Sequence, residues 1–136
     1  MAENTTVKRA DHLRKFDACH AMYNYFSVTI PDDMAAQADF ITIVDVPVGQ
    51  MVVGLTAAPS ATLGASCTLQ ARIGTTAISA ATTAAATTPV VQNAIVAPST
   101  SEATLNFLVG GAAITEPATL TVGFFFVPAQ SVTLAA

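Results

Sequence analysis

From Tyr23 onward, runs of apolar and β-branched residues alternate with polar ones, and glycine, proline or Ser–Thr clusters separate most of the runs. A period of two is typical of strands that bury one face. The pattern predicts about eight short strands at regular spacing, which favours an all-β sandwich or barrel. The predicted strands cover residues 23–30, 39–46, 49–57, 66–73, 89–97, 103–110, 118–127 and 131–135.

The segment ATLTVGFFFV, residues 118–127, illustrates the two faces of such a strand. One face is expected to supply the core with four large apolar side chains: Leu120, Val122, Phe124 and Phe126. Phe125 falls on the opposite face, which would meet water in a monomer. Two interpretations follow, namely a strand that is buried on both faces near the centre of a sheet, or a contact between subunits through Phe125.

Residues 77–89, AISAATTAAATTP, are biased toward alanine and threonine. Alanine alone would favour a helix, but paired threonines disfavour one because β-branched side chains lose χ1 freedom there. We predict the edge of a strand that leads into a long loop.

Residues 1–22 are polar and carry charges of both signs. They are expected to be either an extended arm or a short helix over residues 11–22, in which Asp11 would cap the first turn. The chain therefore divides into an N-terminal arm, residues 1–22, and a β-sandwich domain, residues 23–136.

Charged residues make up only 10% of the 136 residues, whereas about 25% is usual in globular domains. After Val46 the chain holds only Arg72, Glu102 and Glu116 as charged residues. Low charge combined with high apolar content argues against disorder. The net charge of −4 and the single arginine of the β region argue against a nucleic-acid partner.

The mean hydropathy of +0.55 raises the question of a membrane protein. No run of about 20 apolar residues exists, and the N-terminus lacks the apolar core of a signal peptide. We therefore expect no membrane partner and folding in a cytoplasm, with Cys19 and Cys67 reduced.

No arrangement of residues predicts catalysis or a cofactor. The single cluster that resembles a metal site lacks the usual ligand spacing and is expected to be a solvated part of the arm: His12, Asp17, Cys19 and His20. The pair Asp32–Asp33 follows Pro31 and is typical of a turn. No phosphate-binding loop is present. The sequence thus predicts a protein that is not an enzyme.

A threonine- and alanine-rich surface with few charges is poorly protected against association, because natural sheet edges are normally guarded by lysine, proline or bulges. Closed homo-oligomers cover such surfaces, and their interfaces are depleted in charge. We therefore interpret the chain as a building block of a closed homo-oligomer.

Three stretches within residues 38–128 resemble the small β-sandwich proteins that are encoded beside major capsid proteins in tailed bacteriophages. They are a strand that ends in P-x-G at Pro47–Gly49, a T-L-x-x-x-I-G strand at Thr68–Gly74, and a T-L-T-V-G strand at Thr119–Gly123. The resemblance implies a head decoration, or cement, protein with a jelly-roll-like sandwich that bridges neighbouring capsomers as a dimer or trimer.

The same resemblance implies a location on the capsid surface of the virion, after synthesis in the host cytoplasm, with the major capsid protein as partner. A terminal arm commonly grips the shell in such proteins. Ordinary solvation is the alternative explanation for the basic residues of this arm. The residues expected to contact the partner are Lys8, Arg9, Arg14, Lys15 and Phe16, and Phe125 is the residue expected to mediate self-association.

Two other classes of function remain open at this point. The chain could be another virion part, such as a tail, neck or head-fibre base subunit. It could also be a small ligand- or glycan-binding sandwich, although it has no tryptophan and only Tyr23 and Tyr25 as tyrosines.

Overall fold

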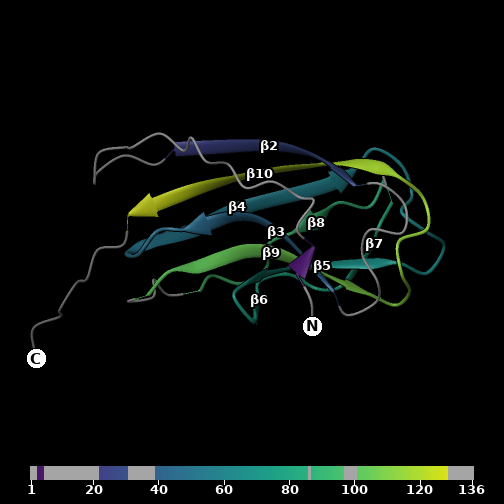
Figure 1. Ribbon diagram of the computed structural model, residues 1–136. Helices are drawn as coiled ribbons and strands as arrows, with labels where there is room; N and C mark the ends of the chain where they lie inside the picture. Colours follow the sequence, from purple (N-terminus) through teal and green to yellow (C-terminus); the bar gives the residue numbers. More distant parts are fainter. Residues whose placement is uncertain (1–2, 5–21, 31–38, 86, 97–100, 129–136) are drawn as a thin grey trace, which may run out of the picture.

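The computed structural model describes residues 3–4, 22–30, 39–85, 87–96 and 101–128, which form two β-sheets packed against each other (Figure 1). No helix occurs within these ranges. The strands are β1 (Glu3–Asn4), β2 (Met22–Ile30), β3 (Phe40–Val46), β4 (Gln50–Pro59), β5 (Thr68–Ile73), β6 (Thr76–Ala77), β7 (Thr82–Thr83), β8 (Val90–Val91), β9 (Ala103–Gly110) and β10 (Ala118–Pro128).

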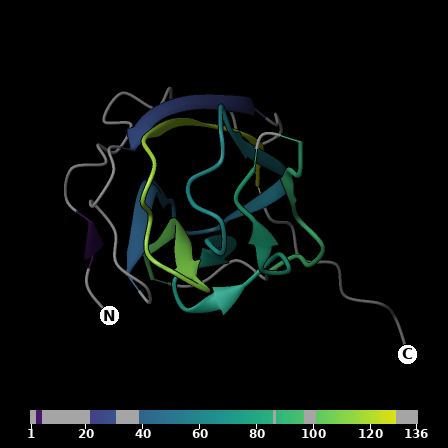
Figure 2. The same cartoon turned by 90° about the vertical axis from the view of Figure 1, so that its right-hand side faces the viewer.

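The strand order identifies the sandwich as a jelly roll. One sheet has the order β2-β10-β4-β8, and the other has the order β1-β3-β9-β5-β6, with β7 also paired to β5. Successive strands from β2 to β5 alternate between the two sheets, and β8, β9 and β10 alternate again. The short strands β6 and β7 together take the place of one strand, which gives the eight-strand jelly-roll arrangement. Figure 2 shows the two layers from the end.

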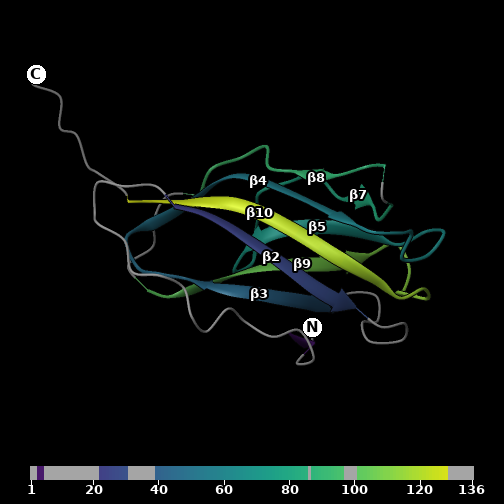
Figure 3. The ribbon, with the colours of Figure 1, turned by 90° about the horizontal axis from the view of Figure 1, so that it is seen from above.

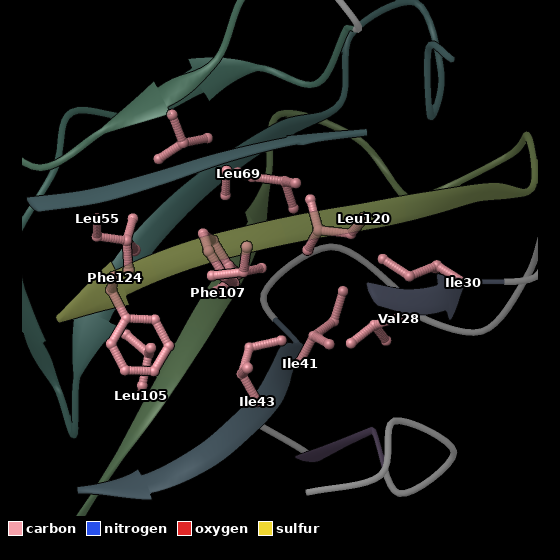
Figure 4. Packing of buried hydrophobic residues seen from close by; sticks show 14 of the residues in the cluster. Val28, Ile30, Ile41, Ile43, Leu55, Leu69, Leu105, Phe107, Leu120 and Phe124 are labelled. Atoms are coloured by element: carbon pink, nitrogen blue, oxygen red, sulfur yellow. The ribbon is translucent and has the colours of Figure 1, made fainter. Parts of the chain in front are cut away.

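The core lies between the sheets and is built from the alternate side chains of the long strands (Figure 4). All four residues that the sequence assigned to the inner face of β10 are fully buried, which confirms that prediction: Leu120, Val122, Phe124 and Phe126. Phe107 of β9 faces them from the other sheet and is also fully buried. The rings of Phe124 and Phe126 meet edge to face, with centroids 5.0 Å apart.

The segment 89–97 differs from its prediction as a full strand, because only Val90 and Val91 pair with β4. The backbone N–H of Gln92 makes one more hydrogen bond to this strand, to Leu55 O at 3.0 Å, and the Gln92 side chain then takes over from the backbone ladder. Its Oε1 accepts a hydrogen bond from Leu55 N at 3.0 Å, and its Nε2 donates to Val52 O at 2.8 Å. An amide side chain can mimic a strand's donors and acceptors, so β8 ends without leaving the edge of β4 unsatisfied.

The described part of residues 77–89, which leaves out residue 86, forms short pieces of strand within a loop, as the composition of the segment predicts. Ala77 ends β6, which pairs with β5, and β7 pairs with the other half of β5. The strand expected over residues 131–135 lies outside the described residues. The same holds for the expected arm over residues 1–22, or helix over residues 11–22, except for residues 3, 4 and 22. Glu3 and Asn4 pair in parallel with the start of β3.

Candidate interaction surface

The four-stranded sheet contains no charged residue in any of its strands. The other sheet does contain charged residues, among them Asp45 in β3 and Arg72 in β5. The outer face of the four-stranded sheet is therefore the part of the described surface that has the least electrostatic protection against association.

Three aromatic side chains stand on this outer face. Tyr23 and Tyr25 of β2 are 56% and 65% exposed, and Phe125 of β10 is 38% exposed. Phe125 lies directly opposite Tyr23 in the antiparallel register, and Tyr25 lies opposite Gly123. We call these three residues the aromatic patch. The interpretation that β10 is buried on both faces is wrong for the single chain at Phe125, because its ring contacts Tyr23 but remains 38% exposed. β10 does lie at an inner position of its sheet, as that interpretation expected.

Two glycines shape the patch. A Cβ atom at Gly54, in β4, would lie 3.5 Å from Cδ2 of Phe125, so the ring rests close to bare backbone. A Cβ atom at Gly123 would overlap the hydroxyl end of Tyr23, which lies over the Gly123 backbone. Aromatic side chains often cover glycines across neighbouring strands. Phe125 can be placed on an outward face from the sequence alone, but the contact of Tyr23 with it cannot, because that contact depends on the register between β2 and β10.

Apolar side chains continue the patch across the sheet. Val53 pairs with Phe125, and Met51 pairs with Val127. The side chains of Met51, Val53 and Val127 are half-buried. Farther along, Val91 of β8 is exposed beside Thr56. The outer face thus offers aromatic, aliphatic and hydroxyl groups without charge, which suits contact with another uncharged surface.

The outer side of the other sheet contains a hollow of about 360 Å³, and Arg72 is one of the residues that line it. The Arg72 side chain is only 6% exposed, and its Nε donates a hydrogen bond to Asn106 Oδ1 at 3.1 Å. Its Cζ lies 5.8 Å from the centroid of the Phe40 ring. Burial lowers the pKa of the Arg72 guanidinium from its ordinary value.

Asn106 holds this region together, which favours a structural role for Arg72. Its Nδ2 donates to Gly74 O at 3.0 Å and to Thr104 O at 3.3 Å. The neighbouring Thr42 carries a buried hydroxyl for which the described residues provide no hydrogen-bond partner. The arrangement fixes three strands to one another and contains no nucleophile next to a base.

Within the described ranges, no group of three or more His, Cys, Asp or Glu side chains is placed to hold a metal ion. In the same ranges no helix has the length and apolar character to cross a membrane. Cys67 is buried with a free thiol, and burial raises the pKa of that thiol.

Several residues singled out in the sequence lie outside the described residues. This holds for the proposed turn at Asp32–Asp33, for the metal-like cluster of the arm and for the residues expected to contact a partner: Lys8, Arg9, Arg14, Lys15 and Phe16. Their roles stay predictions.

No protein-family model and no curated protein matches the sequence. Among solved structures, the fold is similar to a chain of the structure described as "Cyanophage Pam1 capsid asymmetric unit". The likeness covers 88% of this chain and 96% of the other, with a TM-score of 0.53 and 18% sequence identity. Since almost the whole of both chains is covered, the two have similar lengths and match as complete domains. The comparison establishes that this chain shares its sandwich fold with a chain of a phage capsid structure.

Proposed function

We propose that this protein is a structural component of a phage virion, that it binds the outer surface of the head as a decoration protein, and that it has no enzymatic activity. The observation that carries the proposal is the whole-domain likeness to a chain of a cyanophage capsid asymmetric unit. The phage-like stretches of the sequence, which include Thr68–Gly74 and Thr119–Gly123, support it independently.

The chemistry of the four-stranded sheet suits such a role. Its strands carry no charge, and the aromatic patch offers large side chains that bury much area at little cost in side-chain entropy. Many copies on one shell would act together, so contacts that are weak individually would give durable attachment through multivalency. Bridging neighbouring capsomers in this way would stabilise the shell.

The basic residues of the arm are proposed to supply the second contact, with an acidic surface of the major capsid protein. Lys8 and Arg9 form one basic pair, and Arg14 and Lys15 form another, followed by the apolar Phe16. This arrangement would combine electrostatic attraction with one apolar anchor.

The direct test is binding of the purified chain to empty head shells of the virus that encodes it, followed by sedimentation and an electron cryomicroscopy map. We expect regularly spaced density on the outer shell surface. Deletion of residues 1–20 should leave a folded protein that no longer binds shells. A milder variant, in which Lys8, Arg9, Arg14 and Lys15 become glutamine, should bind more weakly at low salt. Its difference from the wild type should shrink as salt is added, because salt screens the attraction that only the wild type has.

Three outcomes would contradict the proposal. Density on tails, necks or fibres would place the protein elsewhere in the virion. Normal shell binding by the deletion variant would overturn the role of the arm. Absence of binding to any particle, together with clear hits on a glycan array, would favour a ligand-binding sandwich.

A further inference from the structure

The edges of the two sheets are protected unequally. In the described part of the chain, three edges are formed by strands of only two residues each, namely β1, β8 and the pair β6 and β7. Short edge strands are one of the ways in which proteins prevent unwanted pairing. The fourth edge is β2, which runs for nine residues from Met22 to Ile30. Figure 3 shows β2 beside β10 at this edge of the four-stranded sheet.

Within its own nine residues, β2 also lacks two other protective devices. It contains no charged residue and no proline. It pairs with β10 at nine consecutive positions, from Met22 opposite Phe126 to Ile30 opposite Ala118, and no bulge interrupts the ladder on that side. A long, regular and uncharged edge is a template for the addition of another strand.

The core is also incompletely closed at this edge. Phe26 points toward the inside of the sandwich and stacks on Phe124, with ring centroids 5.7 Å apart, but it remains only half-buried. Val28 and Ile30 are the next inward-facing residues of β2, and both are buried. A strand placed beside β2 would therefore cover apolar surface of Phe26 in addition to pairing with the backbone.

We propose that β2 pairs antiparallel with β2 of a second copy of this chain, so that two four-stranded sheets become one eight-stranded sheet. A second copy offers a strand of the same length that is equally free of charge, and a two-fold axis pairs it with itself, as in the commonest homodimers. With this axis perpendicular to the sheet, the aromatic patches of both copies face the same side and form one extended uncharged surface. This inference specifies the homo-oligomer that the sequence predicts. It is compatible with the proposed function but does not require a capsid.

The test compares two lysine substitutions on the same face of the same sheet. Ser27 lies on the edge strand β2 and Thr56 lies on the inner strand β4, and both side chains are exposed. Ser27→Lys should raise the dissociation constant of the dimer by roughly tenfold or more, because it sets like charges against each other near the two-fold axis. Thr56→Lys should leave the dimer intact. Light scattering and sedimentation equilibrium from micromolar to millimolar concentration measure both.

Circular dichroism and urea unfolding of both variants show whether each keeps the fold. A monomeric wild-type protein at millimolar concentration would overturn the inference, as would a trimer. Dissociation by Thr56→Lys but not by Ser27→Lys would indicate face-to-face stacking through the aromatic patch instead. Two variants that both stay dimeric would also exclude the β2 edge. Shell binding is measured separately, so a monomer that still decorates shells would contradict this inference and leave the proposed function standing.

Discussion

The ring of Tyr23 meets the ring of Phe125 edge to face across the β2–β10 pair, with centroids 4.9 Å apart and an interplanar angle of 66°. Both side chains nevertheless keep a large exposed area. The contact joins an edge strand to its inner neighbour on the uncharged face, so it fixes the geometry of the surface that we propose to meet other proteins.

Replacement of Phe125 by alanine should have only a small effect on stability. Since the ring is partly exposed, Phe125→Ala should lower the free energy of unfolding by only about 1 kcal/mol, most of it from the lost aromatic pair. A double-mutant cycle with Tyr23→Ala in urea measures that coupling. The matched control is Leu120→Ala in the same strand, which should cost about 2–5 kcal/mol because Leu120 is fully buried. Equal costs for the two variants would contradict the exposed position of Phe125.

Alanine substitutions at two glycines should distinguish the cost of a strained backbone from the cost of steric overlap. Gly49 and Gly111 both have positive φ, 81° and 71°. A Cβ atom at Gly49 meets nothing within 4 Å, whereas one at Gly111 would overlap the carbonyl oxygen of Ser66. Gly49→Ala should therefore cost about 1 kcal/mol, and Gly111→Ala about 2–4 kcal/mol because the backbone must also move. Thermal and urea unfolding measure both, and similar values would exclude the overlap.

Removal of the buried Thr42 hydroxyl should stabilise the protein. A buried polar group without a hydrogen bond is unfavourable, so Thr42→Val should raise the free energy of unfolding by about 1 kcal/mol. Thr104→Val is the matched control on the neighbouring strand, because Thr104 Oγ1 accepts a hydrogen bond from Asn106 Nδ2 at 3.3 Å. That change should destabilise the protein by about 0.5–1.5 kcal/mol. Destabilisation by Thr42→Val would indicate a partner for its hydroxyl.

The Cys67 thiol should make stability fall at alkaline pH. Burial raises the pKa of this thiol in the folded state, so the unfolded chain loses the proton at lower pH than the folded chain does. The protonated thiol contributes fully to the free energy of unfolding below the ordinary thiol pKa. This contribution is lost as the pH rises through the pKa that the thiol has in the folded state. Urea unfolding across this range should show a shallower pH dependence for Cys67→Ala. In a Cys19→Ser background, Cys67 should react with thiol reagents only after unfolding, and rapid reaction in the folded state would contradict its burial.

The long strands could be predicted from the sequence because their periodicity reflects burial on one side. In β10, the inward residues Leu120 and Phe124 alternate with Phe125, and the local pattern alone places them on opposite faces. The segment 89–97 shows why the same reasoning fails elsewhere. Its apolar residues resemble a strand, yet only two of them pair with β4. After them, the Gln92 side chain forms hydrogen bonds with the backbone N–H of Leu55 and the backbone carbonyl of Val52. These partners are distant in the sequence, so the local pattern does not reveal the contact.

Only part of the candidate surface could be predicted from the sequence. Phe125 could be placed on an outward face, but period-two alternation does not say whether that face is covered. The partnership with Tyr23, and the role of Gly54 and Gly123 beneath the rings, depend on strand register and on the order β2-β10-β4. Register follows from long-range packing, which the local pattern does not encode.

The pairing of β2 with β10 joins two segments that are far apart in the sequence, since β2 ends at Ile30 and β10 begins at Ala118. A ribosome makes β2 before the other strands of its sheet and β10 after them, so the four-stranded layer lacks its second strand until β10 has been synthesised. Closing so large a loop is slow compared with local hairpin formation. We therefore expect the nascent polypeptide to expose the inward face of β2 until β10 emerges, an interval in which molecular chaperones would limit its aggregation.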